Sequence, residues 1–181
     1  MTDRGEDPRT DAQLVNAINA GDDRAFEALY FRHRDGVIRL ARRFTHNDDL
    51  AIDVMQETFV YLLGKFPGFR LTARMTTFLY PVVKHLAWTA LNKSRRQHTT
   101  PDPPEVAADD PAIASRDDLA AAMSALGEDQ REVVLMKYVD DMSLDDIAAA
   151  LGIPLGTVKS RLHNALKILR DDPRAKKYFT G

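Results

Sequence analysis

The chain has 181 residues, enough for one medium domain or two small ones, and 44% of them are hydrophobic, as in an ordinary folded protein. It contains no cysteine, which excludes disulfide bonds and metal sites with cysteine ligands. The N-terminus lacks the apolar core of a signal peptide, and no apolar run approaches the roughly 20 residues of a membrane-spanning helix. We therefore expect a cytoplasmic protein without membrane insertion.

The net charge of −2 hides a segregation of charge along the chain. Residues 1–30 carry 3 basic and 7 acidic side chains, and residues 99–130 carry 1 and 8. Residues 31–98 carry 12 basic and 5 acidic side chains, and residues 155–181 carry 7 and 2. Two basic blocks separated by an acidic one predict two contacts with a polyanion, although ordinary solvated surfaces do not forbid this pattern.

Hydrophobic residues recur at helical spacing along most of the chain, and strand signals are nearly absent, which predicts an all-α protein. The stretch from Leu14 to Phe44 contains two helices in this interpretation. Gly21 marks the end of the first, and Asp22 and Asp23 supply an N-cap for the second.

Two further helices are predicted before residue 97. The third should begin at Asn47 or Asp48 and end at Gly64. Residues 67–77 have the composition of a loop, and a fourth helix follows. Pro81 should kink that helix unless it lies in the first turn.

The helical spacing of hydrophobic residues ends near residue 97. Residues 97–115 contain four prolines and four acidic residues but no Lys or Arg, a composition typical of an extended linker. Helical patterning resumes beyond it. We predict an N-terminal helical domain at 10–97, a flexible, acidic and Pro-rich linker at 98–114, and a C-terminal helical domain at 115–175.

Two helical segments lie close together in the C-terminal domain. Ser143 is a good N-cap, with Asp146 placed as the acidic member of a capping box. Gly152 suits the left-handed conformation that ends a helix, and Pro154 favours the start of another. A short helix joined by a tight turn to a longer one is a helix-turn-helix.

The second helix of this pair has a polar, partly cationic outer face. No Asp or Glu occurs from residue 147 to 170, and Asn, Lys and Arg side chains can bind bases or phosphates in a major groove. We predict a DNA contact; the alternative is an ordinary αα-hairpin in a bundle. The candidate residues are Leu155, Gly156, Thr157, Lys159, Ser160, Arg161, His163, Asn164 and Lys167.

The segment GIPLGTVKSRLH, Gly152 to His163, resembles the C-terminal domain of bacterial RNA polymerase sigma factors, especially the extracytoplasmic-function (ECF) group of the sigma-70 family. Many members carry Arg at the position of Asn164. The segments DRAFEALYFRH and DVMQETFVYLL resemble the N-terminal domain of this group, so the resemblance covers roughly residues 12–97 and 115–170.

This resemblance implies a promoter-specificity subunit rather than an enzyme, with no cofactor. Its expected partners are core RNA polymerase, including the coiled coil of the largest subunit and the flap, and promoter DNA at the minus-10 and minus-35 elements. The helix-turn-helix would recognise the minus-35 element. An anti-sigma factor commonly holds members of the group inactive.

Three carboxylates align on one face of the third predicted helix, at Asp49, Asp53 and Glu57. Aligned carboxylates repel one another unless a metal ion, a basic partner or solvent screens them. No Glu-x-x-His motif accompanies them, which favours a basic protein partner over a metal site; a solvated face is the alternative. The resemblance implies that this helix, with Gln56 and Phe59, binds the largest-subunit coiled coil.

Aromatic and basic residues alternate between residues 61 and 96, a pattern suited to single-stranded DNA because rings stack on bases and cations follow phosphates. The resemblance assigns minus-10 opening to this region and a flipped base to the loop at 66–77. Phe59, Phe78 and Trp88 could instead belong to the core. The candidate contacts are Lys65, Phe66, Phe69, Arg70, Arg74, Tyr80, Lys84, His85, Arg95 and Arg96.

Other functions stay open at this point. A stand-alone helix-turn-helix regulator would bind DNA as a dimer without polymerase, and a sigma-like decoy would only titrate an anti-sigma factor. A metal-dependent hydrolase would use the carboxylates, but the histidines, at 33, 46, 85, 98 and 163, show no close ligand spacing. The role of the acidic linker also stays open. The resemblance implies a segment that threads toward the polymerase channels, and the alternative is a plain spacer.

Overall fold

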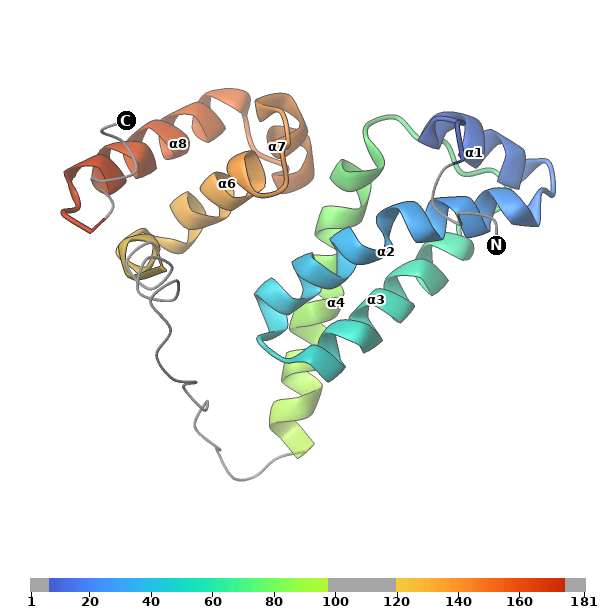
Figure 1. Cartoon of the computed structure of the whole chain (residues 1–181), viewed down its shortest axis with the longest axis horizontal. Helices are drawn as coiled ribbons and strands as arrows, with labels where there is room; N and C mark the ends of the chain where they lie inside the picture. The colour runs from blue at the N-terminus through green and yellow to red at the C-terminus, as the bar shows by residue number, and fades with distance from the viewer. Residues whose placement is uncertain (1–6, 98–119, 175–181) are drawn as a thin grey trace. The chain divides into compact units, whose positions relative to one another are not determined.

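The structure is a computed structural model, and it describes residues 7–97 and 120–174 (Figure 1). All regular elements in these residues are helices, which confirms the all-α fold class for this part of the chain. The chain divides into two compact units, Met1–Pro101 (unit 1) and Asp102–Gly181 (unit 2). The predicted flexible linker at 98–114 lies outside the described residues. None of the described helices is both long and apolar enough to cross a membrane.

The described part of unit 1 contains four helices: α1 (Asp11–Asn19), α2 (Asp23–Thr45), α3 (Asp48–Leu63) and α4 (Met75–Gln97). Helices α2, α3 and α4 pack against one another, and α1 packs against α2 (Figure 1). Their shared core includes Leu14, Leu29, Val54, Leu62 and Val83, which are all completely buried. Burial of each such side chain contributes roughly 1.5–3 kcal/mol, so the apolar stripes of the helices hold this unit together.

Local capping sets the boundaries of the helices in unit 1. The Asp22 side chain accepts two backbone N–H hydrogen bonds, at 3.0 and 3.3 Å, and begins α2. Asn47 begins α3 by accepting the N–H of Leu50 at 2.8 Å, and Gly64 ends α3. Each N-cap side chain pairs with backbone N–H groups that the helix leaves unpaired, and this contributes about 1 kcal/mol to the stability of the protein. The predicted start of the second helix at Asp22 or Asp23, and the predicted start and end of the third helix at Asn47 or Asp48 and at Gly64, are confirmed.

Helix α4 begins earlier than predicted, at Met75, so Pro81 lies inside the helix rather than in its first turn. Proline has no N–H to donate to the preceding turn. The helix nevertheless continues to Gln97. Its apolar face, with Leu79 and Val83 buried in the core on either side of Pro81, explains this continuity because tertiary packing outweighs one missing hydrogen bond.

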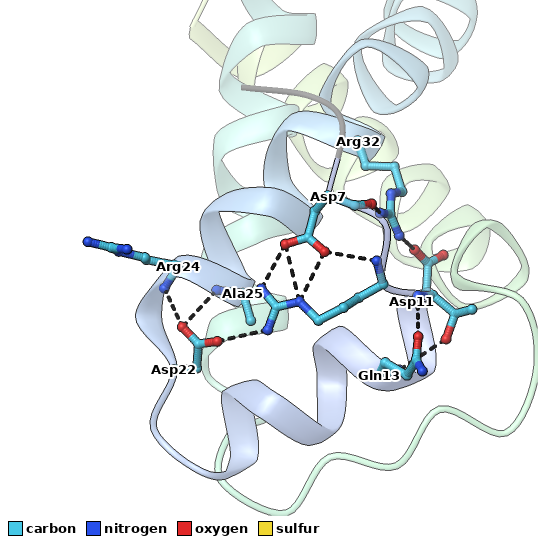
Figure 2. Close-up of polar contacts among 9 residues, drawn as sticks. Asp7, Asp11, Gln13, Asp22, Arg24, Ala25 and Arg32 are labelled. Atoms are coloured by element: carbon cyan, nitrogen blue, oxygen red, sulfur yellow. Dashed lines mark hydrogen bonds and ion pairs between the residues drawn. The ribbon is translucent and has the colours of Figure 1, made fainter. Parts of the chain in front are cut away.

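Ion pairs tie the segment before α1 to α2 (Figure 2). Arg9 pairs with Asp7 at 2.7 Å and with Asp22 at 2.8 Å. Arg32 of α2 pairs with Asp11 at 2.7 Å and donates to the backbone carbonyl of Asp7 at 2.7 Å. Except for Arg9 and Asp7, these partners are distant in sequence, and sequence reasoning did not find them. The network fixes α1 on α2 at the edge of the hydrophobic core.

The described part of unit 2 contains a helical stretch at 120–124 and helices α6 (Glu128–Tyr138), α7 (Leu144–Leu151) and α8 (Leu155–Asp171). Helix α8 packs against both α6 and α7, and α6 also packs against α7 (Figure 1). Val133, Met136, Ile147, Val158 and Ala165 are completely buried between these helices. The buried face of α8 therefore leaves the opposite face to the outside.

Candidate nucleic-acid interface

Helices α7 and α8 form the predicted helix-turn-helix. The Ser143 hydroxyl accepts the N–H of Asp146 at 3.0 Å, and the Asp146 carboxylate accepts the Ser143 hydroxyl at 2.6 Å. Gly152 ends α7 with φ 65° and ψ 32°, and a Cβ atom there would meet nothing, so the left-handed backbone rather than space selects glycine. Pro154, at φ −60°, immediately precedes α8.

The outer face of α8 is accessible to a ligand. Val158, Ala165 and Leu169 are buried on the inner side. No carboxylate lies on α8 before Asp171, so the outer face presents hydrogen-bond donors and positive charge to a polyanion. Of the predicted contacts, Leu155 and Thr157 are half-buried, and the exposed ones are Gly156, Lys159, Ser160, His163, Asn164 and Lys167.

Arg161 differs from the other candidates on α8. Its guanidinium forms an ion pair with the Asp129 carboxylate, and its side chain is 28% exposed. Asp129 lies in the first turn of α6, where the helix dipole favours a negative charge. Arg161 therefore links α8 to α6 in this structure, a contact between residues distant in sequence that the helical pattern of α8 could not reveal.

A second cationic surface covers α4 and the loop before it. Residues 58–97 contain no Asp or Glu. Asn19 at the end of α1 anchors the loop: it donates to the carbonyl of Phe69 at 2.8 Å and accepts the N–H of Gly68 at 2.6 Å. The structure places these predicted basic contacts in exposed positions: Lys65, Arg70, Arg74, Lys84, His85, Arg95 and Arg96.

The aromatic candidates of this region separate into three environments. Phe66, Phe69 and Phe78 are half-buried and form a ring cluster, with centroids 5.5 Å apart for the first pair and 4.8 Å for the second. Tyr80 is 2% exposed and packs edge-on against Phe44, with ring centroids 5.9 Å apart. Trp88 is 65% exposed.

One predicted DNA contact is therefore corrected, and one alternative is excluded. Tyr80 is a core residue in this structure and cannot stack on an unpaired base, because its side of α4 packs into unit 1. Trp88, which could have been a core residue, lies on the surface instead. Helical spacing alone did not decide which side of α4 would be covered.

The outer face of α3 combines charge with apolar surface. Asp49, Asp53, Gln56 and Glu57 are exposed, as predicted. Sequence reasoning missed the large apolar side chains exposed on the same helix: Ile52, Val60, Tyr61 and Leu63, with Val60 at 70%. Such a mixture is typical of a protein-binding surface rather than a plain solvated face. In the described residues, no group of three or more His, Asp or Glu side chains is arranged to hold a metal ion.

Two family models match the chain within these units. The model described as Sigma-70 region 2 matches residues 29–97, and the model described as Sigma-70, region 4 matches residues 116–169. The chain belongs to the ECF group of the sigma-70 family. Region 2 therefore carries α3 and α4, and region 4 carries the helix-turn-helix.

Three sigma factors from other bacteria are similar to this chain along most of its length. The RNA polymerase sigma-H factor of Pseudomonas aeruginosa is 29% identical over 175 residues, which cover 86% of this chain and 89% of that protein. The ECF RNA polymerase sigma factor SigE of Mycolicibacterium smegmatis is 32% identical over 158 residues, or 81% of this chain and 61% of the relative. SigW of Bacillus subtilis is 25% identical over 177 residues, or 88% and 95%.

Two solved structures share the fold. CnrH, solved with the cytosolic domain of CnrY, is similar with a TM-score of 0.65 and 22% identity, over 87% of this chain and 93% of the other. The sigma factor RpoE of Bartonella quintana, solved with the anti-sigma factor NepR, is similar with a TM-score of 0.58 and 21% identity, over 81% and 94%.

These findings decide among the functions left open by the residues. This sigma factor directs RNA polymerase to promoters, and it is a transcription initiation factor rather than an enzyme. The region 2 match excludes a regulator that consists of a helix-turn-helix alone. Core RNA polymerase and promoter DNA are its partners.

Proposed function

We propose that this sigma factor reads the minus-35 element with α8 and opens the minus-10 element with α4 and the loop before it, while α3 holds core polymerase. In this proposal the first domain extends over residues 10–97 and the second over 115–175. The observation that carries the proposal is the exposed face of α8, which contains no carboxylate before Asp171. The opposite face of α8 is buried, and the turn at Gly152 joins α7 to this helix.

The side chains of α8 suit both kinds of DNA contact. Lys159 and Lys167 are exposed cations that can neutralise phosphates or bind guanine, and the exposed amide of Asn164 can bind adenine through two hydrogen bonds. Ser160 donates its hydroxyl to the carbonyl of Thr157 at 3.0 Å, so its free lone pairs can accept a hydrogen bond from a base. The N-terminal turn of α8 can also approach phosphates.

The α3 surface suits the polymerase. Its carboxylates, Asp49, Asp53 and Glu57, match a basic partner, and its exposed apolar side chains supply the hydrophobic contact that holds an interface. We assign this surface to the coiled coil of the largest polymerase subunit. Region 4 would contact the flap.

The minus-10 function rests on the cationic surface of α4 and its loop. The exposed cations Arg70, Arg74 and Arg96 can follow a phosphate strand, and Lys65 lies over the ring of Tyr61, with Nζ 4.3 Å from the centroid. The half-buried rings of Phe66 and Phe69 form one wall against which a flipped base could pack. We leave Tyr80 out of this surface.

We also propose that an anti-sigma factor controls this protein. The similar sigma factor RpoE was solved with the anti-sigma factor NepR, and the similar protein CnrH was solved with the cytosolic domain of CnrY. The exposed apolar side chains of α3, including Ile52 and Val60, would be available to such a partner and to polymerase in turn.

Run-off transcription tests the proposal. Core polymerase with and without the full chain is supplied with a pool of promoter fragments from the host, and we expect selective initiation only with the chain present. Lys159→Glu should abolish this selectivity, whereas Arg170→Glu, the same charge change at an exposed position of α8 outside the proposed contacts, should retain it. Core binding without selective initiation on any fragment would refute the proposed DNA-contact surfaces.

A further inference from the structure

The loop between α3 and α4, residues 64–74, contains no helix or strand, yet it carries part of the surface proposed to open the minus-10 element. Phe66 and Phe69 form the ring wall, and the exposed cation Arg70 follows directly. A surface loop samples many conformations unless other contacts hold it, and each conformation would present these rings differently. The contacts that fix the loop backbone therefore affect how it meets DNA.

Asn19, the last residue of α1, holds the middle of this loop with both groups of its side-chain amide. The amide NH2 donates to the carbonyl of Phe69 at 2.8 Å, and the amide oxygen accepts the N–H of Gly68 at 2.6 Å. The reverse orientation of the amide would bring donors together, so the two partners define its orientation. Figure 1 shows the loop passing beside α1 on its way from α3 to α4.

The backbone of the loop is shaped for this contact. Gly68 has φ 104°, a conformation that residues with a side chain rarely adopt. The turn at Gly68 lets one N–H group and the next carbonyl along the chain reach the same amide. Because both partners of Asn19 are backbone groups, the contact sets the path of the chain at 68–69 directly.

The anchor itself is rigid. Leu14 and Val15 bury the inner face of α1 in the core, and the ion pair between Arg32 and Asp11 ties α1 to α2. Asn19 is half-buried, so water competes less for its amide than at an exposed position. It lies before residues 29–97, the part of the chain that the region 2 model matches. A residue outside that match therefore holds a loop inside it.

We propose that Asn19 is a positioning residue for base capture, which holds the loop in the conformation that receives a flipped base of the minus-10 element. Asn19 acts through the backbone of Gly68 and Phe69 and does not itself bind the base. A loop that is already held loses less conformational entropy when the base enters, so capture is more favourable. This inference rests on the minus-10 role proposed for the loop.

The first test measures promoter opening by holoenzyme made from core polymerase and the full chain, on a promoter found by the run-off assay. Asn19→Ala should lower the open-complex equilibrium constant about 5-fold to 100-fold, because two partly shielded hydrogen bonds are lost. Asn19→Leu, which is similar in shape but forms neither bond, should have the same effect. Asn16→Ala removes the same side chain from an exposed position of α1 and should leave opening unchanged.

An abasic nucleotide separates positioning from a general loss of stability. It is placed in turn at each position of the minus-10 element, and the position at which the wild type loses most opening identifies the captured base. There, Asn19→Ala should cost at most about twofold more, because both changes remove the same interaction, whereas its full effect should persist at the other positions. A variant that only weakens the fold would lower opening equally on every template.

Amide hydrogen exchange tests the contact in the free full chain, without polymerase or DNA. The Gly68 amide should exchange faster in Asn19→Ala and Asn19→Leu than in the wild type and Asn16→Ala. Equal exchange in all four proteins would overturn the inference.

Two results with holoenzyme would also overturn it: opening by both Asn19 variants equal to the wild type, or an equal loss of opening on intact and abasic templates. Failure of the proposed function is seen differently, as a wild type that opens no promoter or that is insensitive to every abasic position. The role in base capture would then fall with it, even if Gly68 exchange depends on Asn19.

Discussion

The ion pair between Arg161 and Asp129 gives the sharpest test of how α8 is positioned. Both residues are partly accessible, with side chains 28% and 65% exposed, so the pair should contribute about 0.2–1 kcal/mol. We expect the pair to hold α8 at its angle to α6. Arg161→Gln and Asp129→Asn should then each weaken promoter binding by roughly 1.5- to 5-fold.

Whether Asp129→Asn weakens or tightens promoter binding distinguishes a positioning role of Arg161 from a direct DNA contact. If Arg161 binds a phosphate and Asp129 competes for it, removal of the carboxylate should tighten promoter binding. If the pair positions α8, both single variants weaken binding, and the double variant is no worse than either one because both remove the same interaction.

The assay is equilibrium binding of promoter DNA by holoenzyme containing the full chain, at several salt concentrations. Loss of a phosphate contact would reduce the slope of log K against log salt by about 0.9, whereas loss of a positioning pair should leave the slope unchanged. Tighter binding by Asp129→Asn, or a reduced slope in Arg161→Gln, would refute the positioning role and restore Arg161 to the DNA-contact set.

Three further predictions address the turn, the N-terminal network and the polymerase surface. Gly152→Ala should destabilise the chain by about 1 kcal/mol because alanine is strained at φ 65°, which urea unfolding would measure; an unchanged midpoint would contradict it. Side-chain and backbone hydrogen bonds from Arg9 lower the pKa of Asp7 to about 2 from 3.8, so stability contributed by the charged network should be complete above about pH 4 and lost as the pH falls toward 2. Asp7→Asn should flatten the dependence of the melting temperature on pH between about pH 2 and 4. An unaltered dependence would show that Asp7 does not cause the loss of stability at low pH. Val60→Asp, at a position 70% exposed on α3, should weaken core-polymerase binding at least about tenfold without lowering the melting temperature, and equal affinity would exclude Val60 from that interface.

Features with local causes could be predicted from the sequence. The caps at Asp22, Asn47 and Ser143 depend on one side chain and the next three backbone N–H groups, so they are recognisable in a short stretch. The turn at Gly152 depends on one residue that tolerates the left-handed conformation. The absence of acids from 147 to 170 is likewise a property of the sequence itself, and it is the basis for the prediction that α8 faces DNA.

Features that depend on which surfaces meet were decided only by the tertiary structure. Tyr80 and Trp88 are both aromatic residues of α4, yet one is in the core and the other is exposed, because α4 turns only one side toward its neighbours in unit 1. The pairing of Arg161 with Asp129 and of Arg32 with Asp11 likewise requires two helices to pack side by side. Helical periodicity defines the faces of each helix, but long-range packing determines which face is covered and which cation reaches a partner.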